Sequence, residues 1–144
     1  MRGVRYVVRA APWLLAVSLT VPVAASAQRS ASAADQCYKL AGHADQRKCL
    51  EERALQSVKA ARDAEAKSKA ALEHWTEEPF SRTRSAALFK KASATYERWR
   101  TAQCEAVASI AAGGNAARDR RLLCEIELNE RRTEDLTAAT AELP

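Results

Sequence analysis

The sequence predicts an all-α fold: an antiparallel bundle of three long helices plus a short N-terminal helix, linked by two disulfides. Three observations predict this fold. No run of alternating β-branched and polar residues occurs, so strands are not expected. After the first thirty residues, only Glu78-Pro79 and Gly113-Gly114 interrupt the chain as clear helix breakers. The same part of the chain contains four cysteines, an even number that is typical of paired disulfides.

The first 27 residues have the three parts of a secretory signal peptide. A basic segment over residues 1–9 precedes an apolar run over residues 10–24, which ends on Ala25-Ser26-Ala27. We therefore expect cleavage before Gln28 and a periplasmic or secreted protein. The alternative is an uncleaved anchor, but a membrane span needs roughly 20 apolar residues, more than this run supplies. No stable membrane span is expected after cleavage.

Signal cleavage changes the charge of the remaining single domain, residues 28–144. The whole chain has 23 Lys and Arg against 18 Asp and Glu. Arg2, Arg5 and Arg9 leave with the signal, so the domain keeps 20 basic against 18 acidic side chains, a net charge of +2. Basic and acidic residues are interleaved, and nucleic-acid recognition needs a strongly basic patch. Nucleic acid is therefore not an expected partner.

The breakers divide the domain into four expected helices, with a softer break at Gly42-His43. These helices cover residues 32–40, 45–77, 84–112 and 116–140. Gly113-Gly114 is suited to ending the third helix, and Asn115 to capping the fourth. Because the connections are short, consecutive long helices are expected to pack antiparallel.

Apolar residues at intervals of three and four predict the packing faces of two long helices. The clearest face belongs to the third helix and consists of Phe89, Ala92, Tyr96, Trp99, Gln103, Val107 and Ile110. A weaker face on the second helix consists of Leu55, Val58, Ala61, Leu72 and Trp75.

Four cysteines allow three pairings, and their spacing about the turns favours one of them. Cys104 and Cys124 lie at similar distances from Gly113-Gly114, so an antiparallel hairpin brings them to the same height. Cys37 and Cys49 flank Gly42-His43 in the same way. We predict the disulfides Cys37–Cys49 and Cys104–Cys124, each stabilising by roughly 3 kcal/mol. The alternative of a zinc site lacks closely spaced Cys or His pairs, and no metal is expected.

The residues around the second disulfide carry a family resemblance. Two aromatics, Tyr96 and Trp99, precede Arg100, and Cys104 follows that arginine by four positions. After the Gly-Gly turn, a second cysteine is followed at four, eight and twelve positions by Leu128, Arg132 and Leu136. This pattern, over about 50 residues, resembles the LprI-type lysozyme-inhibitor family. The sequence departs from the family pattern in the exchanged order of its two aromatics and at Thr101 and Asn129.

The resemblance implies a small helical protein of the periplasm or cell surface. The named member of the family inhibits lysozyme, and most of its relatives have no assigned function. The predicted hairpin register gives the motif a structural role as well, because it places Tyr96 opposite Arg132, Arg100 opposite Leu128 and Ala92 opposite Leu136. A cation–π contact of Arg132 on Tyr96 is expected. Arg100 is expected near three glutamates, Glu97, Glu125 and Glu127. These arginines therefore brace the hairpin or, alternatively, contact a ligand.

No arrangement of residues typical of an enzyme is recognisable, and no cofactor is expected. Neither His43 nor His74 stands in a nucleophile motif. The sequence predicts a non-enzymatic exported binding protein, with a lysozyme as the candidate partner. The alternative is a structural or stress-related envelope protein with another partner.

Two predicted loops offer contacts to such a partner. Gly113-Gly114-Asn115 is small and polar, and the glycines allow a close backbone approach. Glu77, Glu78 and Phe80 combine carboxylates with an aromatic anchor for a basic partner. The simpler alternatives are an ordinary helix-ending turn for the first loop, and Phe80 folding back near Trp75 for the second.

Overall fold

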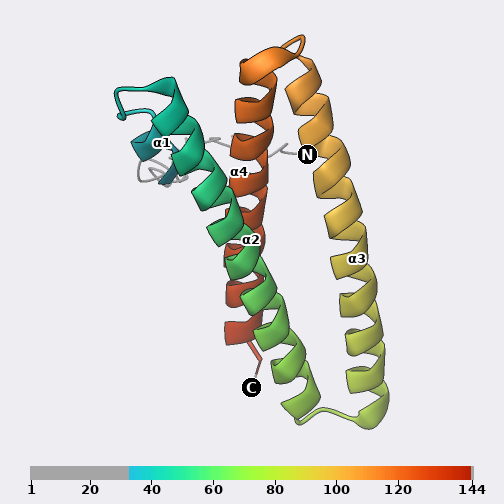
Figure 1. The fold of residues 1–144 in the computed structure, drawn as a ribbon. Coiled ribbons are helices and arrows are strands. Elements are labelled where there is room, and N and C mark those ends of the chain that lie inside the picture. Colours follow the sequence, from blue (N-terminus) through green and yellow to red (C-terminus); the bar gives the residue numbers. More distant parts are fainter. Residues whose placement is uncertain (1–32, 144) are drawn as a thin grey trace, which may run out of the picture.

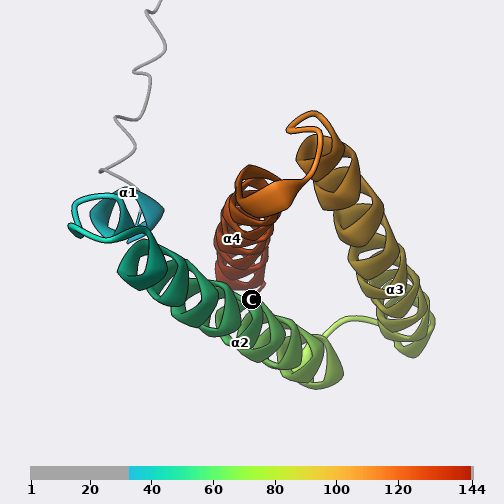
Figure 2. The same cartoon turned by 45° about the horizontal axis from the view of Figure 1, so that its top comes forward.

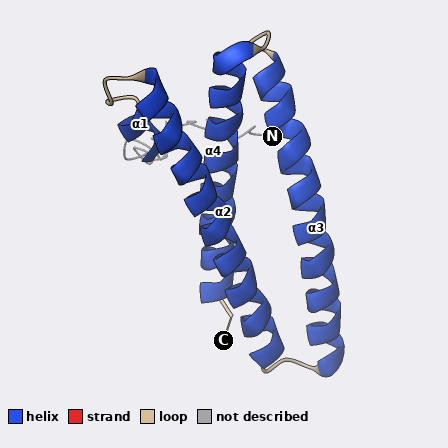
Figure 3. Ribbon diagram, viewed as in Figure 1, coloured by secondary structure: helices blue, strands red, loops and turns tan. Residues whose placement is uncertain are grey.

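The computed structural model describes residues 33–143 of the chain (Figure 1). This part is helical throughout apart from its connections, with no strand (Figure 3), and it confirms the predicted all-α class. Its helices are α1 (Ala33–Cys37), α2 (His43–His74), α3 (Pro79–Ser109) and α4 (Gly114–Ala141). The predicted signal peptide, residues 1–27, and the predicted helix start at Ser32 lie outside the described residues. None of the helices within residues 33–143 combines the length and apolar content that crossing a bilayer requires.

Helix ends differ from the predictions at both turns of the bundle. α3 begins at Pro79 rather than at residue 84, because proline at the first helical position loses no helical hydrogen bond. α4 begins at Gly114 with Gly113 as its N-cap, so the prediction that Asn115 caps this helix is wrong. Ala112, Gly113 and Gly114 have φ values of 54°, 97° and 70°. Three consecutive positive φ values reverse the chain, and glycine adopts such values without steric cost.

Consecutive long helices run antiparallel, so α2 is parallel to α4 (Figure 1). α4 packs most extensively against α2 and next against α3. Figure 2 shows α2 and α3 converging at the turn that joins them and diverging away from it. α4 is therefore the central helix, and α3 depends mainly on α4 for its packing.

The α2–α4 interface has one register along its whole length. Three side-chain hydrogen bonds join residues that are 72 positions apart: Arg47 to Asp119, Asn129 to Ser57, and Ser68 with Thr140. The buried residues of α2 recur at intervals of four and three: Leu50, Ala54, Ser57, Ala61, Ala64 and Ser68. Those of α4 are Asp119, Leu122, Ile126, Asn129 and Leu136. Small side chains on α2 thus lie level with larger ones on α4, in the spacing of a coiled coil.

The apolar packing faces predicted from the sequence are confirmed only in part. Leu55 is 73% exposed, although Ala61 of the same predicted face is buried. Trp99 of α3 and Ile110 directly after this helix are exposed, and the buried residues of α3 are Cys104 and Ala108. Close helix packing here uses alanine and serine, whose weak hydrophobicity leaves little periodic signal in the sequence.

Both predicted disulfides are present, with Cα–Cα distances of 5.5 Å. Cys37–Cys49 ties the short helix α1 to α2, where Ala34 and Cys37 join a buried cluster with Leu50, Leu122 and Ile126. Cys104–Cys124 ties α3 to α4 near their common turn. The pairing predicted from the spacing of the four cysteines about the turns is therefore confirmed.

Candidate interaction site on the third and fourth helices

A buried hydrogen-bond chain joins the three long helices at Asn129. The Asn129 side chain is fully buried, and its amide nitrogen donates to the Ser57 hydroxyl at 3.0 Å. Its amide oxygen accepts from Arg100 Nη1 at 2.6 Å. The Ser57 hydroxyl donates in turn to the Ala54 carbonyl at 2.8 Å. Each buried polar side-chain atom of this hydrogen-bond chain has a partner, so burying these atoms costs little.

The partner of Arg100 is thus an amide of α4 rather than one of the predicted glutamates. The register placed Leu128 opposite Arg100, and the hydrogen bond goes to the next residue, Asn129. Asparagine is a polar residue, so its identity alone does not predict that it is buried. The spacing of Asn129 from Ile126 and Leu136, which matches the α4 packing face, is the feature of the sequence that could have predicted its burial.

Arg132 connects the same three helices one turn further along α4. Its guanidinium donates to Glu65 of α2 from Nε at 3.3 Å and from Nη2 at 3.1 Å. Nη2 also donates to the Ser93 hydroxyl of α3 at 3.2 Å. The guanidinium carbon lies 5.0 Å from the centre of the Tyr96 ring and 6.0 Å from that of Phe89. The predicted cation–π contact of Arg132 on Tyr96 is confirmed.

Replacing Arg132 by lysine is expected to lower the free energy of unfolding by about 1–2 kcal/mol. A lysine ammonium lacks the planar fork that reaches Glu65 and Ser93 together while it stacks on Tyr96. Urea unfolding followed by circular dichroism measures the loss. Arg131→Lys is the matched control, because Arg131 is exposed and pairs with Glu127 on its own helix. Equal losses in the two variants would contradict a bracing role for Arg132.

Tyr96 is fixed from both ends and forms the inner wall of this region. Its hydroxyl donates to the Leu128 carbonyl of α4 at 2.7 Å. Burial raises the pKa of the Tyr96 hydroxyl, against the opposing effect of Arg100 and Arg132. Trp99 lies beside it with the ring centres 6.0 Å apart, and its indole is 49% exposed. Leu136, the last residue of the predicted motif, is buried in the α2–α4 interface.

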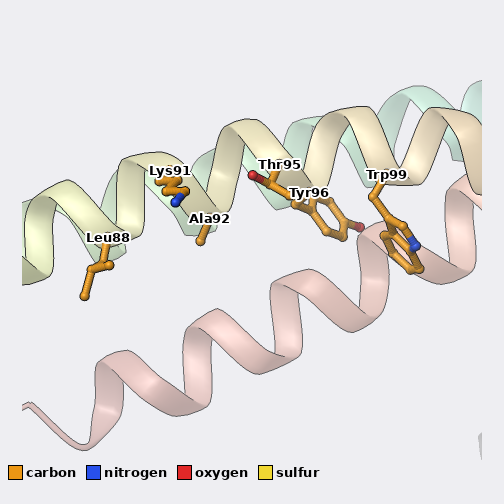
Figure 4. Close-up of a pocket in the computed structure, with 6 residues that line it drawn as sticks. All are labelled: Leu88, Lys91, Ala92, Thr95, Tyr96 and Trp99. Atoms are coloured by element: carbon orange, nitrogen blue, oxygen red, sulfur yellow. The ribbon is translucent and has the colours of Figure 1, made fainter.

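A shallow groove runs along α3 beside these aromatics (Figure 4). It is lined by Leu88, Lys91, Ala92, Thr95, Tyr96 and Trp99. Leu88, Ala92, Tyr96 and Trp99 point from α3 toward the side on which α4 runs. Three of these residues, Ala92, Tyr96 and Trp99, belong to the packing face predicted for the third helix, and the sequence did not predict that this face would remain open.

The two predicted contact loops lie at opposite ends of the bundle (Figure 1). At the first loop Gly113, Gly114 and Asn115 are exposed, and the Asn115 amide oxygen accepts from Arg47 at 2.9 Å. At the second loop Glu77 and Glu78 are exposed, and Phe80 is 75% exposed. Phe80 therefore does not fold back onto the bundle.

A charged cluster near the first loop was missed by the sequence analysis. Arg47 Nε donates to the buried Asp119 carboxylate at 3.2 Å, and His43 Nε2 lies 3.7 Å from the same carboxylate. Arg118 and Glu51 form a second pair between α4 and α2 beside it. These residues hold the cysteine-linked end of α2 on α4, and only the parallel register of the two helices brings them together. Within residues 33–143, no three His, Cys, Asp or Glu side chains gather as a metal site.

The arrangement on α3 and α4 presents aromatic rings, basic side chains and an open groove on a braced scaffold. Such a surface is suited to contact with another macromolecule, since large apolar side chains on it can be buried by a partner. No family model, curated protein or solved structure matches this chain.

Proposed function

We propose that this chain is a non-enzymatic exported binding protein of the periplasm or the extracellular space. The exposure of large apolar side chains on α3 carries the proposal. Phe80, Leu88, Trp99 and Ile110 are 49–75% exposed, while the described core consists mainly of small residues. Within the described residues, four of the seven exposed large hydrophobic side chains thus lie on α3 or directly after it, and such a concentration offers a surface for a protein partner.

Two further observations support the compartment in this proposal. Both disulfides link buried or half-buried cysteines, and such bonds persist in oxidising compartments outside the cytoplasm. The N-terminal segment has the pattern of a secretory signal peptide. The bracing contacts of Arg100 and Arg132 favour a rigid scaffold over a reactive centre.

A lysozyme is the first partner to test, because the motif from Tyr96 to Leu136 resembles the LprI-type inhibitors. The loop between α2 and α3 is the contact that we propose for it. In the α2–α4 register, α4 ends near the level of residue 69, so this loop projects beyond α4. Glu77 and Glu78 would attract a basic enzyme, and the exposed Phe80 ring would anchor the contact.

If the loop binds lysozyme, the double variant Glu77→Lys/Glu78→Lys should lose inhibition by roughly tenfold or more, because reversed charges repel a basic enzyme. Inhibition of several lysozyme classes by the purified mature protein measures this. Glu52→Lys, at an exposed glutamate of α2 away from this loop, is the control and should inhibit like the wild type. Both variants should keep the wild-type melting midpoint. Absence of inhibition by the wild type against every class would overturn lysozyme as the partner.

A further inference from the structure

We propose that the groove on α3 binds an acidic amphipathic helix of a partner protein. This inference deepens the proposed function, since it rests on the chain being a binding protein, and it names a second contact surface. The spacing of the apolar residues, the charge along the groove and the rigidity of its inner wall support it.

Four residues of the groove have the spacing that helices use to pack together. Leu88, Ala92, Thr95 and Trp99 recur at intervals of four, three and four, as the buried residues of α2 do on α4. Leu88 and Trp99 are 56% and 49% exposed, so a partner can bury large areas of both. The small side chains between them let the backbone of a second helix approach closely. A groove of this shape accepts an amphipathic helix through its apolar face.

The groove has a fixed inner wall, which favours binding without rearrangement. Tyr96 is held at its hydroxyl by the Leu128 carbonyl and at its ring by the Arg132 guanidinium. Arg132 is itself held by Glu65 and Ser93. The position of the wall therefore depends on contacts with both other long helices.

A row of cations lies along one edge of the groove. Arg84, Lys91 and Arg98 recur at intervals of seven residues, close to two helical turns, so they share one side of α3. All three are exposed, and none has an ion pair in the described part of the chain. α3 carries six basic side chains against two acidic ones, whereas α4 carries five against six. The interleaving of charges predicted for the whole domain does not hold on α3, and this edge favours an acidic partner.

A second copy of this chain fits the groove less well. In an antiparallel pair of α3 helices centred between Ala92 and Thr95, Leu88 would face the Trp99 of the other copy. The same arrangement would place Lys91 beside the Arg98 of the other copy, and juxtaposed like charges disfavour association. The charge along the edge therefore favours an acidic partner over self-association.

The test uses the mature, disulfide-bonded protein and a synthetic amphipathic helical peptide of about 18 residues, or five turns. The peptide carries leucine at intervals of three and four, with glutamate beside the leucines. A matched peptide carries lysine in place of each glutamate. Fluorescence anisotropy of the labelled peptides measures binding at low and high salt. We expect binding of the glutamate peptide that weakens with salt, and much weaker binding of the lysine peptide.

Charge reversal by Lys91→Glu should weaken binding of the glutamate peptide by roughly tenfold or more and leave the melting midpoint of the protein unchanged. Lys48→Glu is the matched control, since Lys48 is an exposed lysine of α2, away from the groove, and should bind like the wild type. Equal binding by the two variants, or equal binding of the two peptides, would overturn the proposal. A wild-type dimer in sedimentation that Leu88→Arg converts to a monomer would also overturn it, by assigning the groove to a second copy. The lysozyme contact is tested separately, by the inhibition that the Glu77→Lys/Glu78→Lys variant retains, so either proposal can fail without the other.

Discussion

Replacing Cys104 and Cys124 together by serine is expected to lower the free energy of unfolding by about 3 kcal/mol. The disulfide closes a loop across 20 positions of the chain, and its loss frees the unfolded state of that constraint. The native state is weakened at a vulnerable place as well. α3 packs mainly on α4 and has little contact with α2, so the disulfide strengthens the one main interface that holds this helix.

Thermal unfolding followed by circular dichroism measures this loss, which corresponds to a drop in Tm of roughly 10–20 °C for a domain of this size. The double variant with alanine separates loss of the bond from burial of a hydroxyl at Cys104, which is fully buried. Substitution of the exposed Lys90 is the control and should leave the midpoint nearly unchanged. Matching melting curves for the wild type and both double variants would show that the bond does not stabilise the domain.

The sequence predicted the features that depend on local chain reversal. Glycine and proline located the turns, and the similar distances of Cys104 and Cys124 from Gly113-Gly114 gave both their pairing and the hairpin register. From that register followed the contact of Arg132 with Tyr96. These inferences succeed because an antiparallel hairpin relates residues by their distance from one turn.

The sequence did not predict the α2–α4 interface, and the reason is physical. α2 and α4 are parallel and separated by all of α3, so no turn sets their register. Their contact face uses Ala54, Ser57 and Ala64 on α2, whose side chains are too small to give a strong hydrophobic period. The packing face of α2 was predicted from its large apolar residues instead, so Leu55 was predicted to pack although it is exposed.

A similar reason explains why residues of the groove were predicted to pack inside the bundle. Tyr96 and Trp99 belong to one helical face, and an amphipathic face usually packs inward. α3 has one neighbour along most of its length rather than two, so only part of that face is covered. A sequence specifies which residues share a face, but the number of helices that cover it depends on how the bundle opens.

Replacing Asn129 by alanine is expected to lower the free energy of unfolding by about 2–4 kcal/mol. The substitution leaves the Arg100 guanidinium and the Ser57 hydroxyl without the amide that joins them. A hydrogen bond to a charged group contributes about 1.5–3 kcal/mol, and an unpaired buried partner adds its desolvation cost. Urea unfolding measures the change. Asn115→Ala is the matched control, because that exposed amide accepts only a surface hydrogen bond from Arg47 and its loss should cost well under 1 kcal/mol.

A double-mutant cycle decides whether Asn129 acts through Arg100. If the two side chains form one unit, Arg100→Ala and Asn129→Ala together should cost at least about 1 kcal/mol less than the sum of the single losses. Asn129→Ala alone leaves the Arg100 guanidinium unpaired, and Arg100→Ala alone leaves the Asn129 amide oxygen unpaired, whereas the double change leaves neither. The same cycle between Asn129 and Arg131, an exposed arginine whose ion pair is with Glu127, should be additive. Additivity in the first cycle would show that the buried asparagine stabilises the domain through its own packing and not by joining α3 to the α2–α4 pair.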